Sequence, residues 1–197
     1  FVLLFLMLPI LIIIPLSFNA EPFFSFTPGM LKLDPEAYSL RWYRSILDSP
    51  NWILAIKNSF IIGIFATLLA TLLGTVAAMG LSQEHMPFRR LITALLLSPM
   101  IVPLIIIAAG MFFFYTKFNL TGTFIGIVIA HATLGLPFVI ITVTATLSGL
   151  DPSLYRAAIS LGASPLYAFR TVLLPIIRPG VISAALVAFV TSFDAIV

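Results

Sequence analysis

Charged residues are scarce in this sequence of 197 residues, where they occupy 9% of the positions, while hydrophobic residues occupy 61%. A soluble domain needs about 25% charged residues to cover its surface with groups that water solvates. The mean hydropathy of +1.18 agrees with this deficit. The composition therefore excludes an ordinary soluble protein, and lipid must be the solvent for most of the chain.

Three further absences narrow the possible functions. Cysteine is absent, which excludes disulfides and thiolate metal sites. The sequence contains no Gly-x-x-x-x-Gly-Lys-Ser/Thr phosphate loop, so the chain lacks that means of binding ATP by itself. The net charge is +3, but Lys and Arg are spread over loops without a basic run, which argues against nucleic-acid binding. We expect no cofactor and no metal ion.

Long uncharged stretches predict membrane-spanning helices, since about 20 apolar residues cross a hydrocarbon core of ~30 Å. They lie at Phe1–Ala20, Asn58–Gln83, Leu91–Thr116 and Phe118–Leu150, and a fifth begins at Pro179 and is broken only by Asp194. Barrel strands would alternate apolar and polar residues, and these stretches do not. The sequence thus predicts an all-α polytopic membrane protein with about five transmembrane helices.

Proline and small residues recur inside these stretches. Membrane helices tolerate proline when neighbouring groups satisfy the freed carbonyl, so we expect the prolines at 99, 103 and 137 to lie within spans. On the second span, small residues recur every three or four positions from Gly63 to Ala78. Such a face allows another helix to approach closely, although small residues are also common in membrane helices in general.

The chain begins and stops inside apolar runs, so we expect it to be part of a longer subunit with a sixth span. The opening run is longer than the apolar region of a signal peptide and lacks a basic start, which favours a first transmembrane helix. We divide the chain into residues 1–51, with a first helix and a non-membrane loop, and a membrane core at 52–197. Lys and Arg are balanced, five on each side of the membrane, so the positive-inside rule does not decide the orientation.

The first long loop covers residues 18–51 and is rich in Phe and Pro. A short helix capped by Ser39 is expected in it, with Leu40, Tyr43 and Leu47 on one face. Trp42 and Tyr43 suit the interface between lipid and water, where amphipathic rings are favoured. We interpret this loop as an anchor on the membrane surface, and a ligand-binding role is the alternative.

The second long loop, residues 149–178, predicts two short amphipathic helices. Asp151 and Pro152 form a helix start, with a capping side chain and then proline at the first helical position. Gly162 is typical of a left-handed residue that ends a helix. Ser164 and Pro165 repeat the start signal, and we expect the second helix to stop at Pro175. The apolar faces of both helices need a membrane surface, another part of the protein or a partner to cover them.

The same loop carries a resemblance to a known family. Arg156, Ala157 and Ala158, then Gly162, then Leu174 and Pro175 resemble the Glu-Ala-Ala loop of ATP-binding-cassette (ABC) importer permeases. Identity and spacing agree except at Arg156, where the family has glutamate. In that family the loop is the coupling helix that docks on the ATP-binding subunit. The resemblance implies that role for Arg156, Ala157, Ala158, Gly162, Ser164, Pro165 and Pro175.

Other motifs extend the resemblance over most of the chain. Residues 39–43, Ser-Leu-Arg-Trp-Tyr, and residues 192–194, Ser-Phe-Asp, are similar to the spermidine/putrescine branch of these permeases. The resemblance implies a multi-pass protein of the bacterial inner membrane, with the 149–178 loop cytoplasmic and the 18–51 loop extracytoplasmic. It also implies three partners, namely an ATP-binding subunit, a second permease subunit and an extracytoplasmic substrate-binding protein. The expected substrate is a small solute, polyamine-like or related.

Asp194 and Ser192, in the fifth span, are candidates for contact with the solute. Asp194 is ionisable at membrane depth, which by itself suggests a functional site. It either lines the path with Ser192 and attracts a cationic solute, or it pairs with a polar group on another helix. His131 stands alone in the fourth span, and we interpret it as a residue that packs helices together.

Two other functions compete with the importer. A secondary transporter or channel places charges or broken helices near the midplane and often contains repeats, and we find no repeat here. An intramembrane serine protease would need a Gly-x-Ser-x-Gly elbow, whereas Gly162-Ala163-Ser164 is followed by Pro165. We therefore expect a transport subunit and not an enzyme.

Overall fold

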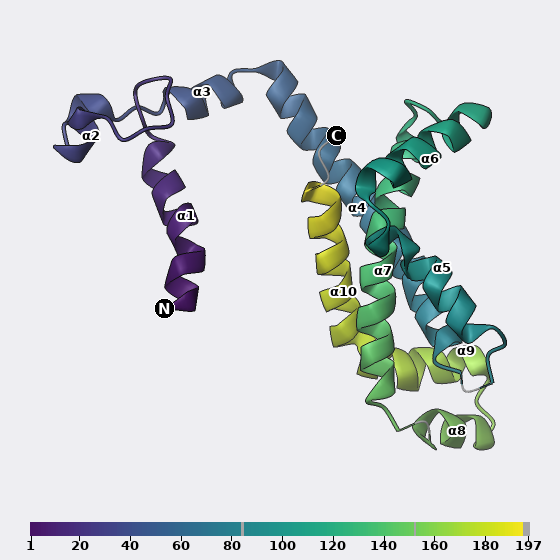
Figure 1. The fold of residues 1–197 in the computed structure, drawn as a ribbon. Coiled ribbons are helices and arrows are strands. Elements are labelled where there is room, and N and C mark those ends of the chain that lie inside the picture. The colour runs from purple at the N-terminus through teal and green to yellow at the C-terminus, as the bar shows by residue number, and fades with distance from the viewer. Residues whose placement is uncertain (84, 152, 195–197) are drawn as a thin grey trace. The chain divides into compact units, whose positions relative to one another are not determined.

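The computed structural model describes residues 1–83, 85–151 and 153–194, and helices are its regular elements (Figure 1). Within these ranges the only β pairing is an isolated bridge between Asn19 and Tyr38. The all-α class predicted from the sequence is confirmed. The chain divides into two compact units, Phe1–Lys57 and Asn58–Val197, which are described separately below. The functional division at residue 51 stays a prediction.

The first unit contains one longer helix and three short ones. They are α1 (Val2–Leu16), α2 (Pro28–Leu31), η1 (Pro35–Ala37) and α3 (Arg41–Leu47), followed by the start of α4 (Pro50–Leu81). The 15 residues of α1 extend over about 22 Å, which is less than the ~30 Å of a hydrocarbon core. Ser17 ends the helix, because its hydroxyl donates a hydrogen bond to the Ile14 carbonyl. Within the described residues the first expected span is thus an apolar helix of 15 residues.

The second unit is built on three long apolar helices. These are α4, α7 (Phe124–Ser148) and the continuous helix Pro165–Asp194, which comprises α9 (Pro165–Ala168), the π-helical turn η2 (Phe169–Leu173) and α10 (Leu174–Asp194). The remaining helices are α5 (Arg89–Ile101), α6 (Leu104–Lys117) and α8 (Ser153–Ser160). In Figure 1, α10 runs beside α7, and α8 and α9 lie at one end of these helices.

The third expected span is broken near its middle. α5 and α6 meet at an angle of 107°, with Val102 and Pro103 in extended conformations between them. Proline has no N–H to donate and disfavours helical geometry in the residue before it, so Pro103 ends α5 at Ile101. The described residues thus contain three candidate spans, or four if the bent pair counts as one. Together with the shorter apolar helix α1, these helices account for the five stretches that the sequence predicts.

Proline acts differently at the start of α10. We expected a helix that stops at Pro175, but the helix continues through Pro175 and Pro179 to Asp194. A proline ring clashes with the carbonyl four residues earlier, and the π-helical turn Phe169–Leu173 changes the hydrogen-bond spacing at this point. The prediction of a stop is therefore wrong, because the wider turn absorbs the proline.

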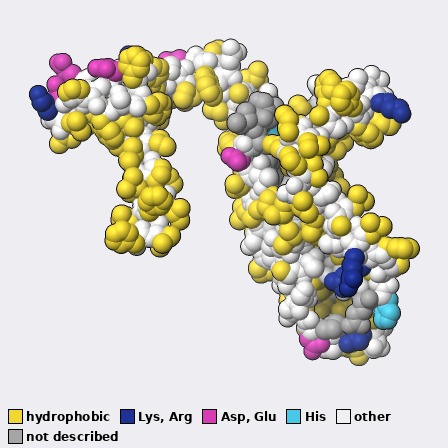
Figure 2. All heavy atoms as spheres, in the orientation of Figure 1, with side chains coloured by type: hydrophobic (Ala, Val, Ile, Leu, Met, Phe, Trp, Pro, Cys, Tyr) yellow, Lys and Arg dark blue, Asp and Glu magenta, His cyan; other side chains and the backbone are white. Residues whose placement is uncertain are grey.

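Small residues form the contact between α4, α7 and α10. The buried cluster there consists of Ala66, Ala70, Ala78, Ala132, Val139, Val143, Ala184 and Ala188. A Cβ atom built on Gly74 would lie 2.6 Å from Val139 Cγ1, and one on Gly135 would lie 3.2 Å from Ala188 Cβ. The small-residue face of the second span is thus a packing face. Large apolar side chains point outward instead, and they cover much of the visible surface in Figure 2.

This packing predicts different effects at two glycines of α4. We expect Gly74→Ala to lower the melting temperature in detergent, because the added methyl group has no space beside Val139 and overpacking costs about 1–3 kcal/mol. Gly80→Ala is the matched control, since nothing lies within 4 Å of its Cβ position. Thermal unfolding followed by circular dichroism measures both. Equal melting temperatures for the two variants would contradict the close contact.

Candidate functional site

The loop between α7 and α10 begins with a capped helix. Asp151 Oδ1 accepts a hydrogen bond from the Ser153 N–H at 2.8 Å, so the side chain closes the first turn of α8. Hydrogen bonds from Ser153 hold the pKa of Asp151 below its usual value, with a smaller contribution from the charge of Arg156. The carboxylate is therefore negative at neutral pH, which the positive end of the helix dipole favours. Pro152, expected at the first helical position, lies outside the described residues.

The C-terminal end of α8 is closed by Gly162, as the sequence predicts. Its φ angle is +88°, in the left-handed region that favours glycine. The Ala163 N–H donates to the Ala158 carbonyl at 3.1 Å, and the Gly162 N–H donates to the Ile159 carbonyl at 2.9 Å. This pair of bonds is a Schellman motif, which satisfies carbonyls that the helix end leaves free.

A second capped start follows at once. Ser164 Oγ accepts a hydrogen bond from the Tyr167 N–H at 3.3 Å, and Pro165 takes the first helical position. The Tyr155 hydroxyl donates to the Pro165 carbonyl at 3.4 Å, which links α8 to α9. The sequence did not predict this link. This hydrogen bond connects the two helices of the loop, so they do not lie independently of each other.

The loop presents apolar side chains to its surroundings. Leu161 is 89% exposed, and Leu154, Leu166 and Tyr167 are exposed as well. A shallow hollow opens between the two helices, lined by Ala158, Leu161, Gly162, Ala163, Ser164 and Tyr167. Arg156 and Ala157 are exposed on α8, and Pro175 is exposed at the start of α10. None of the described residues covers this apolar surface, which agrees with the prediction that the membrane, another part of the protein or a partner must cover it.

At the other end of α10, a buried polar contact joins two helices. His131 Nδ1 of α7 lies 2.9 Å from Ser192 Oγ and 3.1 Å from the Ser192 carbonyl oxygen. Because the carbonyl only accepts, a hydrogen bond to it requires a proton on Nδ1. His131 therefore packs helices together, as interpreted from the sequence. Its partner was missed, because the two residues are 61 positions apart.

A small cavity adjoins this contact. It holds about 200 Å³, and its lining includes His131, Tyr115, Thr121 and Gly126. The Tyr115 hydroxyl is buried and has no hydrogen-bond partner among the described residues. Asp194 is exposed near the end of the same helix, two residues after Ser192. Polar groups thus gather at this end of α7 and α10.

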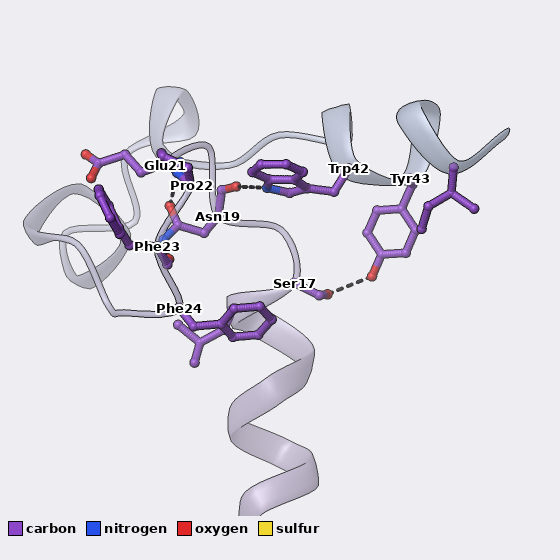
Figure 3. Close-up of a pocket in the computed structure, with 10 residues that line it drawn as sticks. Ser17, Asn19, Glu21, Pro22, Phe23, Phe24, Trp42 and Tyr43 are labelled. Atoms are coloured by element: carbon purple, nitrogen blue, oxygen red, sulfur yellow. Dashed lines mark hydrogen bonds between the residues drawn. The ribbon is translucent and has the colours of Figure 1, made fainter. Parts of the chain in front are cut away.

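The first unit holds a second candidate site, around Asn19 (Figure 3). Asn19 is 2% exposed, and its side-chain amide donates to the carbonyls of Phe23 and Ser25, both at 2.9 Å. The Trp42 Nε1–H donates to the Asn19 carbonyl at 2.9 Å. Asn19 therefore holds the loop in place, a role that nothing in its sequence context indicated.

Aromatic rings and one acid line a cavity of about 450 Å³ in this unit. Its lining includes Glu21, Phe23, Phe24, Trp42 and Tyr43. The hydroxyls of Tyr43 and Ser17 lie 2.6 Å apart, which joins α3 to the end of α1. Ser39 was expected to cap α3, but the N-cap residue is Leu40; Ser39 lies one position earlier, where its Oγ accepts from the Arg41 N–H at 3.2 Å. Trp42 and Tyr43 thus each form a hydrogen bond that holds the loop, while their rings remain partly exposed.

Comparisons with known proteins identify the family. Residues 70–197 match the family described as the binding-protein-dependent transport system inner membrane component. The spermidine/putrescine transport system permease protein PotC of Haemophilus influenzae is 29% identical over 98% of this chain and 72% of its own length. The trehalose transport system permease protein SugB of Mycobacterium tuberculosis is 30% identical over 95% of this chain and 67% of its own length.

A third relative is the putrescine transport system permease protein PotI of Escherichia coli, 29% identical over 98% of this chain and 68% of its own length. These relatives are inner-membrane permeases, which agrees with the apolar helices and the resemblance found in the 149–178 loop. The chain belongs to the binding-protein-dependent transport system inner membrane component family, as a multi-pass permease subunit of an ABC importer in the bacterial inner membrane.

Proposed function

We propose that this permease forms the path for a small cationic solute of the polyamine class and couples it to a separate ATPase through residues 149–178. The observation that carries the coupling is the capped loop with an uncovered apolar surface, at the connection between two long membrane helices. Capping fixes the shape of the loop before any partner binds, so docking costs little ordering. The family membership supports the importer over a secondary transporter or channel.

The proposed assembly has three further members. The sequence lacks a phosphate loop, so a separate subunit supplies ATP hydrolysis and this chain has no ATPase site of its own. A substrate-binding protein delivers the solute on the extracytoplasmic side, and a second permease subunit, identical or related, completes the path. With the 149–178 loop on the cytoplasmic side, Arg156, Ala157, Ala158, Gly162, Ser164, Pro165 and Pro175 belong to the coupling region.

Two groups of residues support a cationic solute. Asp194 and Ser192 lie at the end of α10, where the ring of His131 and the Tyr115 hydroxyl are also found. The cavity of the first unit combines Glu21 with the rings of Phe23, Phe24, Trp42 and Tyr43. Aromatic faces attract cations, and a carboxylate adds charge complementarity. Two of the relatives are named for putrescine or spermidine transport, and one is named for trehalose transport.

The coupling role predicts a loss of function at Gly162. We expect Gly162→Val to reduce solute-stimulated ATPase activity of the assembled importer several-fold, because a β-branched residue disfavours φ of +88° and opens the end of α8. Gly149→Val is the matched control in the same loop, since Gly149 has a φ of −85°, which valine adopts. Co-purification of the ATPase subunit and its activity in proteoliposomes are measured for both. Full stimulation in Gly162→Val would overturn the coupling proposal at this residue.

The apolar surface of the loop gives a second test of docking. We expect Leu161→Glu to weaken co-purification with the ATPase subunit, because a charge replaces a side chain that is 89% exposed and available to a partner. The high exposure means that the substitution leaves the fold of the permease intact. Leu47→Glu, at an exposed leucine in the loop on the opposite side, is the control and should retain the ATPase. Equal retention in both variants would contradict docking at α8.

The solute path is tested at Asp194. We expect Asp194→Asn to reduce transport of a cationic solute about tenfold while neutral solutes are affected little, because the carboxylate attracts positive charge at membrane depth. Asp48→Asn, at an exposed acid outside the long helices, is the control. Uptake is measured in proteoliposomes that contain the matching binding protein. An equal loss for cationic and neutral solutes would assign Asp194 to structure and not to the path.

A further inference from the structure

A groove lies on the second unit between α5 and α7, at the end where α4 and α7 finish. It holds about 790 Å³ and is lined by Leu81, Arg89, Arg90, Thr93, Ala94, Leu97, Ile140, Ile141, Thr144, Ala145 and Ser148. Figure 2 shows Lys and Arg side chains gathered near the lower end of α5. The groove does not include α8, and although it shares α7 with the polar cluster around His131, its lining begins at Ile140, toward the other end of that helix.

The lining changes in character along the groove. Arg89 and Arg90 are the first two residues of α5, while Leu97 lies about 12 Å further along that helix. α7 runs in the opposite sense along the groove, so Ser148 lies at its charged end and Ile140 and Ile141 at its apolar end. The hydroxyl of Thr93 lies between the two ends. Cations, then hydroxyls, then aliphatic side chains follow the order of phosphate, glycerol ester and acyl chain in a phospholipid.

The start of α5 favours an anion for a separate reason. Arg89 and Arg90 lie at the positive end of the helix dipole, where cations destabilise a helix. The N-cap residue Phe88 is left-handed, with φ of +52°, and provides no side chain that caps the first turn. These two arginines therefore do not stabilise the start of α5. A phosphate group at this point would interact favourably with both guanidinium groups and with the helix start.

The middle of the groove has space and hydrogen-bonding capacity. Ala94 and Ala145 line it with methyl groups only, so the groove stays open between the two helices. Thr144 Oγ1 is buried and has no partner among the described residues. Thr93 and Thr144 are the polar side chains in the middle of the lining.

We propose that this groove binds one anionic phospholipid, with the phosphate at Arg89 and Arg90 and an acyl chain along Leu97, Ile140 and Ile141. Basic pockets between transmembrane helices recognise anionic headgroups, which surround any protein of the bacterial inner membrane. The apolar half of the groove favours a lipid over an acidic surface of the ATPase subunit, which would match only the arginines. The site is separate from the proposed transport path.

Native mass spectrometry of the assembled importer tests this proposal directly. Delipidated complex is titrated with phosphatidylglycerol, and with phosphatidylcholine as the zwitterionic comparison. We expect Arg89→Gln with Arg90→Gln to weaken phosphatidylglycerol binding at least about tenfold, because each basic residue near the headgroup adds to the attraction. The control pair is Arg170→Gln with Arg178→Gln, two exposed arginines outside the groove, which should bind as the parent does. Inorganic phosphate should not compete, since it lacks the acyl chain.

The apolar half of the site is tested without changing any charge. Ile141→Trp fills the groove, and we expect it also to weaken phosphatidylglycerol binding at least about tenfold. Ile125→Trp, at an exposed residue of the same helix outside the groove, is its control. Equal loss in the two arginine pairs would show diffuse attraction and overturn the site. Normal lipid binding in Ile141→Trp would contradict binding of an acyl chain in the groove. If the double variant Arg89→Gln with Arg90→Gln bound lipid normally but lost the ATPase subunit, the arginines would belong to the contact with that subunit.

Discussion

α7 and α10 approach each other so closely that side chains beyond Cβ have no space at several points of their contact. A Cβ atom on Gly180 would lie 2.9 Å from Thr146 Cβ, and one on Gly135 would lie 3.2 Å from Ala188 Cβ. In lipid, apolar side chains gain little from leaving the solvent, so van der Waals contact over a close approach is what holds helices together. The position of both functional regions follows from this contact. The 149–178 loop connects the two helices at one end, and the bond between His131 and Ser192 joins them near the other.

Much of the candidate site could be predicted because helix ends are set by local chemistry. Ser164 and Gly162 act on residues within one turn, and their capping roles are visible in the sequence. The pairing of His131 with Ser192 could not be predicted, since it depends on how two helices pack. The same holds for Asn19, whose burial depends on the fold of the whole loop around it.

Proline shows where sequence reasoning about the fold fails. Pro137 lies inside α7, Pro103 separates α5 from α6, and Pro175 follows a π-helical turn within a continuous helix. The residue is the same in each case, and the outcome depends on whether neighbouring turns satisfy the freed carbonyl and relieve the ring clash. Hydropathy alone therefore finds the five apolar stretches, but it does not show that one of them is a pair of helices bent by 107°.

The shape of the 149–178 loop depends little on the charge of Arg156. Its shape depends on Asp151, Gly162 and Ser164, and the hydrogen bonds that these residues form do not involve the side chain of Arg156. Arg156 is exposed on α8, so a change from glutamate to arginine at this position leaves the caps and the apolar surface in place. Apolar contact in the centre of an interface supplies affinity, while charges at its rim select partners and repel wrong ones. In the docking that we propose, an ATPase cation that pairs with the family's glutamate would instead face Arg156 and be repelled. The charge reversal would then restrict which ATPase subunit binds, without altering how the loop folds.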